Sequence, residues 1–198
     1  MITTSTLTLL SPCNMLECTI LEQDSGCTTI QLPYSNIKGI TPQEAFECRN
    51  AGAVEASTKW ITFVDPLDTY NWDKHLALLA SLETVAQDTS MILIPPKGFS
   101  LDGIEHALKL GQACPTGCIT VRKDRFLELG GFNIEIPHSA SWEFLVRYIK
   151  AYSVETAIQS SAHTWQYHYN RNSIANTMLP PHTEVMNWRR EWLQTLFV

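Results

Sequence analysis

The order of hydrophobic and polar positions along the chain predicts short strands that alternate with helices. Apolar or β-branched runs predict strands at residues 6–10, 18–21, 28–32, 60–64, 91–94, 118–121 and 162–169. Helical spacing predicts helices at 42–56, 73–86, 142–151 and 183–196, and a helical turn at 126–129. Such alternation is typical of an α/β sheet protein. The run at 60–64 is apolar apart from Thr62, so we expect an inner strand buried on both faces.

Length and composition favour one globular domain. The chain has 198 residues, of which 44% are hydrophobic and 17% charged. We therefore expect a single domain over residues 1–198, with about residues 180–198 as a C-terminal helical appendage. The formal net charge of -6 argues against non-specific nucleic-acid binding, which needs clustered lysines and arginines.

Cysteine spacing and hydropathy indicate the cellular compartment in which the protein is expected. The six cysteines form no Cys-x-x-Cys pair, so a zinc site is not indicated and free thiols are expected. The apolar run near the N-terminus is too short for a signal peptide, and no stretch approaches the ~20 apolar residues of a membrane span. The expected location is the cytoplasm.

The segment RNAGAVEASTKWITFVDPLD, residues 49–68, carries the clearest candidate chemistry. Asp65 and Asp68 directly follow the predicted buried strand, and ligands of open α/β sheets bind at the carboxyl ends of strands. Carboxylates placed there can hold Mg²⁺ or Mn²⁺, which can neutralise a diphosphate leaving group. The alternative is that both aspartates cap the following helix, since Asp is common in such turns.

Four segments, in order along the chain, resemble family 2 glycosyltransferases. They are TLTLLSPCN at 6–14, TILEQDSGCT at 19–28, the segment 49–68, and TGCITVRKDRFLELGGFN at 116–133. The resemblance covers roughly residues 5 to 175. It implies the GT-A fold of nucleotide-diphospho-sugar transferases, with a central, mostly parallel sheet flanked by helices.

The resemblance also implies roles for individual residues. Asp24 would contact the nucleotide base, and Arg49 would lie beside the nucleotide and its phosphates. Asp65 matches the first acidic position of the metal turn, and Asp68 the last, which ligates Mn²⁺ or Mg²⁺. Gly117 would leave room beside the donor sugar.

Several positions depart from the family pattern. Leu67 replaces an aspartate of the metal turn, and Ser141 stands where the family has the aspartate that deprotonates the acceptor hydroxyl. Glu143 could substitute as the base, or it and Glu135 could be solvated surface carboxylates. Between residues 14 and 18 there is also no room for the crossover helix of a parallel βαβ unit.

Aromatic positions near the C-terminus have two interpretations each. Trp165, Tyr167 and Tyr169 alternate with polar residues and could form a sugar-stacking platform or a core face. His168 could assist a metal or be structural. The tryptophan-rich helix at 183–196 offers a surface on which a second copy could dock.

Three functional hypotheses follow. The first is a hexosyltransferase-type enzyme that moves a sugar from a nucleoside-diphosphate sugar, such as a UDP-sugar, to a hydroxyl of a carbohydrate or other acceptor. The second is a catalytically degenerate relative that binds a nucleotide or glycan. The third is an unrelated α/β protein whose motif matches are chance.

Overall fold

The computed structural model describes residues 7–11, 28–31, 41–65, 68–85, 89–94, 115–153, 156–160, 164–166, 168 and 182–196. Its strands are β1 (Leu7–Ser11), β2 (Thr28–Gln31), β3 (Trp60–Phe63), β4 (Thr69–Tyr70), β5 (Met91–Leu93), β6 (Ile119–Arg122), β7 (Ala157–Gln159) and β8 (Trp165–Gln166). Its helices are α2 (Pro42–Glu55), α3 (Trp72–Val85), α5 (Lys123–Glu128), α6 (Ala140–Tyr152), α8 (His182–Leu196) and the 3₁₀ turn η3 (Thr116–Cys118).

A central sheet organises these elements. Among the described residues, six strands pair in the order β2-β1-β3-β6-β5-β7, and β4 with β8 forms a separate antiparallel ribbon. Strand β1 is parallel to β2 and β3, and β5 is parallel to β7, whereas β6 is antiparallel to both of its neighbours. The expected α/β architecture with a mostly parallel central sheet is therefore confirmed.

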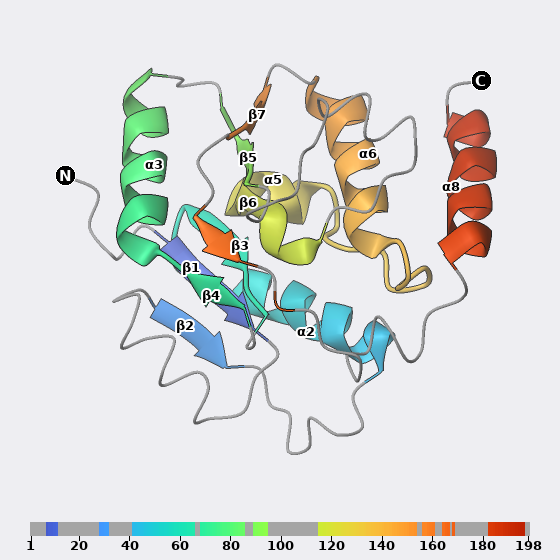
Figure 1. The fold of residues 1–198 in the computed structure, drawn as a ribbon, viewed down its shortest axis with the longest axis horizontal. Helices are drawn as coiled ribbons and strands as arrows, with labels where there is room; N and C mark the ends of the chain where they lie inside the picture. Colours follow the sequence, from blue (N-terminus) through green and yellow to red (C-terminus); the bar gives the residue numbers. More distant parts are fainter. Residues whose placement is uncertain are drawn as a thin grey trace.

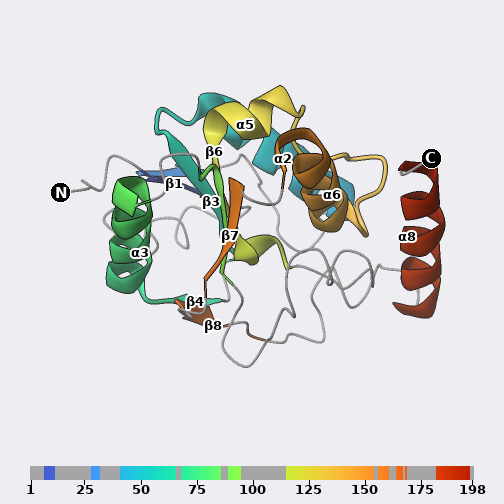
Figure 2. The same ribbon diagram turned by 90° about the horizontal axis from the view of Figure 1, so that it is seen from above.

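The helices cover the two faces of this sheet. Figures 1 and 2 show α3 on one side and α2 with α6 on the other, while α8 lies outermost beside α6. Strand β3 is buried throughout, as expected from its apolar sequence, and lies between β1 and β6. On the α6 side, Phe46, Phe63, Phe126, Phe132 and Phe144 pack with neighbouring ring centroids 4.8–5.4 Å apart. This aromatic cluster attaches α2, α5 and α6 to β3.

Local sequence explains where α2 begins. Thr41 and Glu44 form a reciprocal capping box, in which Glu44 N donates to Thr41 Oγ1 at 3.2 Å and Thr41 N donates to Glu44 Oε2 at 2.6 Å. Pro42 follows at the first helical position, where its missing N–H costs no hydrogen bond. The predicted start of this helix is therefore confirmed.

Several predicted elements differ from the structure. Strand β8 spans two described residues rather than the predicted 162–169, and the sequence pattern did not predict β4 or β7. The predicted strand at 18–21 lies outside the described residues. Cys48 and Cys118 form no disulfide. No helix of the described part combines the length and apolar character needed to cross a membrane.

Candidate functional site

A buried arginine of α2 meets the first carboxylate of the acidic turn. Asp65 lies two residues past the carboxyl end of β3, and Arg49 Nη2 donates to Asp65 Oδ1 at 2.7 Å. The Arg49 side chain is 7% exposed, whereas the Asp65 side chain is 39% exposed. The structure thus places together two residues that are 16 positions apart in the chain, at the edge where α/β sheets bind ligands.

Asp68 completes the turn. Its backbone N–H donates to Asp65 O at 3.0 Å, and its Oδ1 accepts from the backbone N–H of His168 at 3.0 Å. Burial raises the pKa of Asp68 to about 7, and the neighbouring Asp65 carboxylate adds to the rise while the His168 N–H opposes it. Within the described residues, Asp68 Oδ2 is buried without a hydrogen-bond partner.

The acidic turn does not cap the next helix. Strand β4 follows Asp68, and α3 begins only at Trp72. Asn71 provides the cap, because its Oδ1 accepts from Lys74 N at 3.0 Å. The interpretation of Asp65 and Asp68 as helix caps is therefore wrong for the structure described.

Two unsatisfied polar atoms belong to residues of the acidic turn and its arginine. In the described part of the chain, Arg49 Nε is a buried donor without an acceptor, and Asp68 Oδ2 is a buried acceptor without a donor. An anionic group would satisfy the donor, and a divalent cation would satisfy the acceptor. Magnesium is typically held by one or two carboxylates together with substrate phosphates. The described residues contain no cluster of three or more His, Cys, Asp or Glu side chains. The two carboxylates of the turn are the number that such a shared site takes.

An aromatic stack lies next to the acidic turn. The Tyr70 ring is parallel to Trp72 at 4.6 Å and to Trp165 at 5.7 Å between centroids. A Cβ at Gly117 would lie 3.0 Å from Tyr70 Oη and 3.1 Å from the Trp165 ring. The space beside Gly117 is thus filled by these two rings. Trp165 is 3% exposed, so this position is core, while Tyr167 and Tyr169 lie outside the described residues.

The position expected to hold the catalytic base lies at the start of α6. Ser141 is half-buried in the first turn of that helix. Glu143 is 2% exposed, and both of its carboxylate oxygens accept from the Arg147 guanidinium, with Oε2 at 2.8 Å from Nη2. The interpretation of Glu143 as a solvated carboxylate is therefore wrong, whereas Glu135 is exposed as expected.

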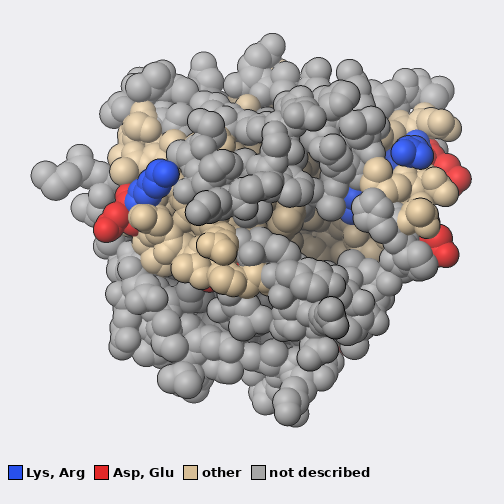
Figure 3. Space-filling view, viewed as in Figure 1, with Lys and Arg blue, Asp and Glu red and all other residues tan. Residues whose placement is uncertain are grey.

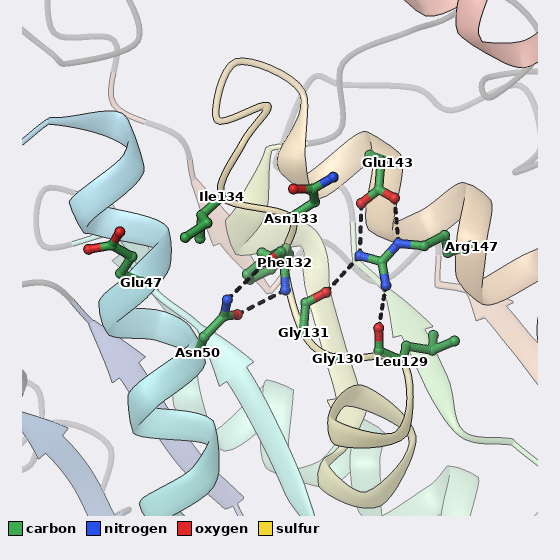
Figure 4. A pocket seen from close by; sticks show the side chains of 10 residues that line it. All are labelled: Glu47, Asn50, Leu129, Gly130, Gly131, Phe132, Asn133, Ile134, Glu143 and Arg147. Atoms are coloured by element: carbon green, nitrogen blue, oxygen red, sulfur yellow. Dashed lines mark hydrogen bonds and ion pairs between the residues drawn. The ribbon is translucent and has the colours of Figure 1, made fainter.

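A cavity of about 580 Å³ opens between α2, the turn after α5, and α6. Figure 4 shows two sets of hydrogen bonds in its lining. In the first, Asn50 exchanges two hydrogen bonds with the backbone of Phe132, at 2.9 and 2.8 Å. Arg147 binds Glu143 and also donates to the carbonyls of Leu129 and Gly131. This network fixes the turn after α5 against both helices.

Some expected site residues cannot be placed, and others were missed. Asp24 and Leu67 lie outside the described residues. The hydrogen-bonding role of the buried His75 gave no sequence signal, because a lone histidine in a helix has no spaced partner. The pair Glu143 and Arg147 did carry a signal, namely opposite charges at i and i+4 in a predicted helix.

Charges are mixed on the face shown in Figure 3. Acidic and basic side chains lie side by side over α3 and again over α8. No single-sign patch forms over the described residues visible on this face. The arrangement there gives no support for a nucleic-acid surface.

No protein-family model and no curated protein matches the sequence. Solved structures do match the fold. A fragment of TarS from S. aureus in complex with UDP-GlcNAc aligns with a TM-score of 0.59 and 14% identity, over 95% of this chain and 58% of that one. The mannosyltransferase PcManGT from Pyrobaculum calidifontis, in complex with GDP-Man and Mn²⁺, aligns at 0.56 and 9%, over 82% of this chain and 56% of that one.

These neighbours are GT-A glycosyltransferases. The chain has a GT-A-like fold. Glucosyl-3-phosphoglycerate synthase from Mycobacterium tuberculosis, in complex with Mn²⁺, UDP-Glc and phosphoglyceric acid, supports this at a TM-score of 0.54 and 12% identity, over 96% of this chain and 78% of that one. The chain spans a little over half the length of the TarS fragment and of PcManGT.

Proposed function

We propose that this chain is a glycosyltransferase-like protein that binds a nucleoside-diphosphate sugar with Mn²⁺ or Mg²⁺ at the turn formed by Asp65 and Asp68. The acceptor would be a hydroxyl of a carbohydrate or similar molecule. Membership of family 2 and transfer of a hexose are part of this proposal. It is supported by the resemblance of four ordered segments and by the GT-A-like fold.

One observation carries the proposal. The acidic turn and its arginine present a buried donor at Arg49 Nε and a buried acceptor at Asp68 Oδ2, both without partners in the described residues. Leaving such groups unsatisfied costs about 1–3 kcal/mol each. A ligand that carries both an anionic oxygen and a cation removes both costs, and a metal-bound diphosphate has this composition.

The chain's own residues would divide the binding task. A bound Mn²⁺ or Mg²⁺ would supply positive charge to the diphosphate leaving group. Asp68 would hold the cation through Oδ2 while the His168 N–H keeps Oδ1 in place. Arg49 would present its guanidinium to the phosphates while its ion pair fixes Asp65. Asp24 would contact the nucleotide base, as the resemblance implies.

A specific observation favours a second candidate, a catalytically degenerate binding module. Serine at position 141 cannot take a proton from an acceptor hydroxyl unaided. Glu143 is the nearby candidate for a substitute base, but both of its oxygens already accept from Arg147. We therefore propose that donor binding persists while turnover is slow or absent.

Calorimetry with nucleoside diphosphates and nucleotide sugars, with and without Mn²⁺, tests donor binding. Asp68→Asn retains an oxygen for the His168 N–H but removes the charge, so the variant should fold and lose its metal-dependent affinity by at least about tenfold. Glu135→Gln, at an exposed carboxylate, is the matched control and should bind like the parent. Absence of binding to every compound with metal present would refute the donor site.

Turnover is tested separately with Ser141→Asp. General-base assistance contributes about 10²–10⁴ in rate, so a restored carboxylate should raise sugar transfer or donor hydrolysis within that range. Glu135→Gln should leave the parent's rate unchanged. Brisk turnover by the parent would show that position 141 is not where the base belongs.

A further inference from the structure

A chain of four buried polar side chains crosses the core between the sheet and the β4–β8 ribbon. Thr62, Thr120, His75 and Thr164 are all 0–1% exposed. Thr62 Oγ1 lies 2.7 Å from Thr120 Oγ1, His75 Nε2 lies 3.3 Å from Thr120 Oγ1, and His75 Nδ1 lies 3.0 Å from Thr164 Oγ1. Thr62 Oγ1 also donates to the carbonyl of Ile119 at 3.2 Å. These contacts connect β3, β6, α3 and the start of β8.

Counting hydrogens fixes the direction of this chain. Each threonine hydroxyl has one hydrogen to donate. All three contacts of Thr62 and Thr120 are hydrogen bonds at once only when Thr62 donates to the Ile119 carbonyl, Thr120 donates to Thr62, and His75 Nε2 donates to Thr120. Burial lowers the pKa of His75 to about 4, so near pH 7 the ring is neutral and carries one hydrogen, on Nε2. Nδ1 therefore accepts from the hydroxyl of Thr164. The direction of donation thus places the single hydrogen of the neutral His75 on Nε2.

The Thr164 end of this hydrogen-bonded series contacts the β4–β8 ribbon, which lies next to Asp68. Thr164 immediately precedes β8, and its carbonyl accepts from Asn71 N at 2.7 Å. Strand β8 pairs with β4, which begins directly after Asp68. Beyond β8, the backbone N–H of His168 donates to Asp68 Oδ1. The hydrogen bond between the Thr164 hydroxyl and His75 Nδ1 therefore attaches this ribbon to α3.

We propose that His75, through Thr164, is a positioning residue for Asp68: it anchors the β4–β8 ribbon to the sheet so that Asp68 is held by His168. The role of Asp68 as a donor-site residue rests on the proposed function, whereas the anchoring itself is a property of the folded protein. A ribbon with only two described residues in each strand has few main-chain bonds of its own, so its position depends on such side-chain contacts.

Hydrogen exchange of the His168 amide tests the anchoring without any ligand. Thr164→Val keeps the side-chain shape but removes the hydroxyl that binds His75, and should speed exchange at His168 by about tenfold or more through local opening. Thr62→Val is the matched control, because it removes a threonine hydroxyl from the same hydrogen-bonded series, but at the end that lies in the sheet. It should leave His168 exchange within about twofold of the parent. Equal acceleration in both variants, or none in Thr164→Val, overturns the proposal.

Nitrogen NMR of His75 supplies a signature that general packing would not produce. The parent should show the Nε2–H tautomer, and an Nδ1–H tautomer overturns the proposed direction of the chain. Affinity for Mn²⁺ with a nucleoside diphosphate then tests the link to function, with at least about a threefold loss expected in Thr164→Val and none in Thr62→Val. If the parent binds no such ligand, the proposed function fails, while exchange and tautomer still decide the anchoring.

Discussion

At the scale of single residues, Asn50 shows how one side chain connects distant segments. It belongs to the Arg-Asn-x-Gly sequence of α2, and its amide binds both the N–H and the carbonyl of Phe132, 82 positions along the chain. Gly131, just before Phe132, has a φ of +72°, in the left-handed region that favours glycine. A Cβ there would lie 2.5 Å from Asn50 Oδ1. The glycine is therefore required by both backbone conformation and space.

Adjacent glycines allow these two requirements to be separated. Gly130→Ala also introduces a side chain at positive φ, +78°, but no atom lies within 4 Å of its Cβ, so it should cost about 1 kcal/mol. Gly131→Ala adds displacement of Asn50 and loss of its two hydrogen bonds, for a total of about 3 kcal/mol. Denaturant unfolding measures both. Equal losses would mean that Asn50 moves aside without cost.

At the scale of elements, the attachment of α6 depends on an ion pair whose carboxylate, Glu143, is buried. Arg147 binds Glu143 one helical turn earlier and two carbonyls of the turn after α5. Arg147→Met would leave the Glu143 carboxylate buried without its partner, and should reduce the free energy of unfolding by about 3–5 kcal/mol.

Two further variants test whether that loss of stability comes from the unpaired charge of Glu143. Glu143→Leu combined with Arg147→Met removes both charges and should recover a large part of it, because replacing a buried pair by apolar residues is often neutral. Arg125→Met, at the exposed pair with Glu128, should change stability little. A double variant less stable than Arg147→Met alone would contradict this assignment.

The sequence predicted long elements well because their patterns repeat. The bounds of α2, α6 and α8 match the predicted helices within two residues, and β3 is the expected inner strand. Strands β4 and β8 have two residues each, too few for an alternation to be recognised. Their pairing joins positions 69–70 to 165–166, so it depends on tertiary contacts.

The candidate site was predictable only in part for a similar reason. Placing Arg49 and Asp65 together follows from a helix packed on the strand that it precedes. The contact between Asp68 and His168 spans 100 residues and uses a backbone N–H, which no side-chain pattern records. Trp188 and Trp192 of α8 pack against Trp142 of α6. Docking of a second copy on this helix stays a prediction.

At the scale of the whole molecule, the buried His75 and the half-buried Asp68 give stability opposite dependences on pH. Burial lowers the pKa of His75 to about 4, so its contribution is complete above its unfolded value of 6.5 and is lost as pH falls through about 4. Burial raises the pKa of Asp68 to about 7, so its contribution is complete below its unfolded value of 3.8 and is lost as pH rises through about 7. Between about pH 4 and 7 the two therefore oppose each other.

Single variants should separate these opposing effects in metal-free protein. Asp68→Asn removes the Asp68 effect and leaves the His75 effect unopposed, so relative to the parent, stability should fall further as pH drops from 6.5 to 4. In His75→Asn the Asp68 effect remains, so relative to the parent, stability should fall further as pH rises from 4 to 7. Urea unfolding across this range with a chelator present gives the two difference curves, in which titrations shared with the parent cancel. If both difference curves change with pH in the same direction, then folding does not shift the pKa of Asp68 upward and that of His75 downward as the structure indicates.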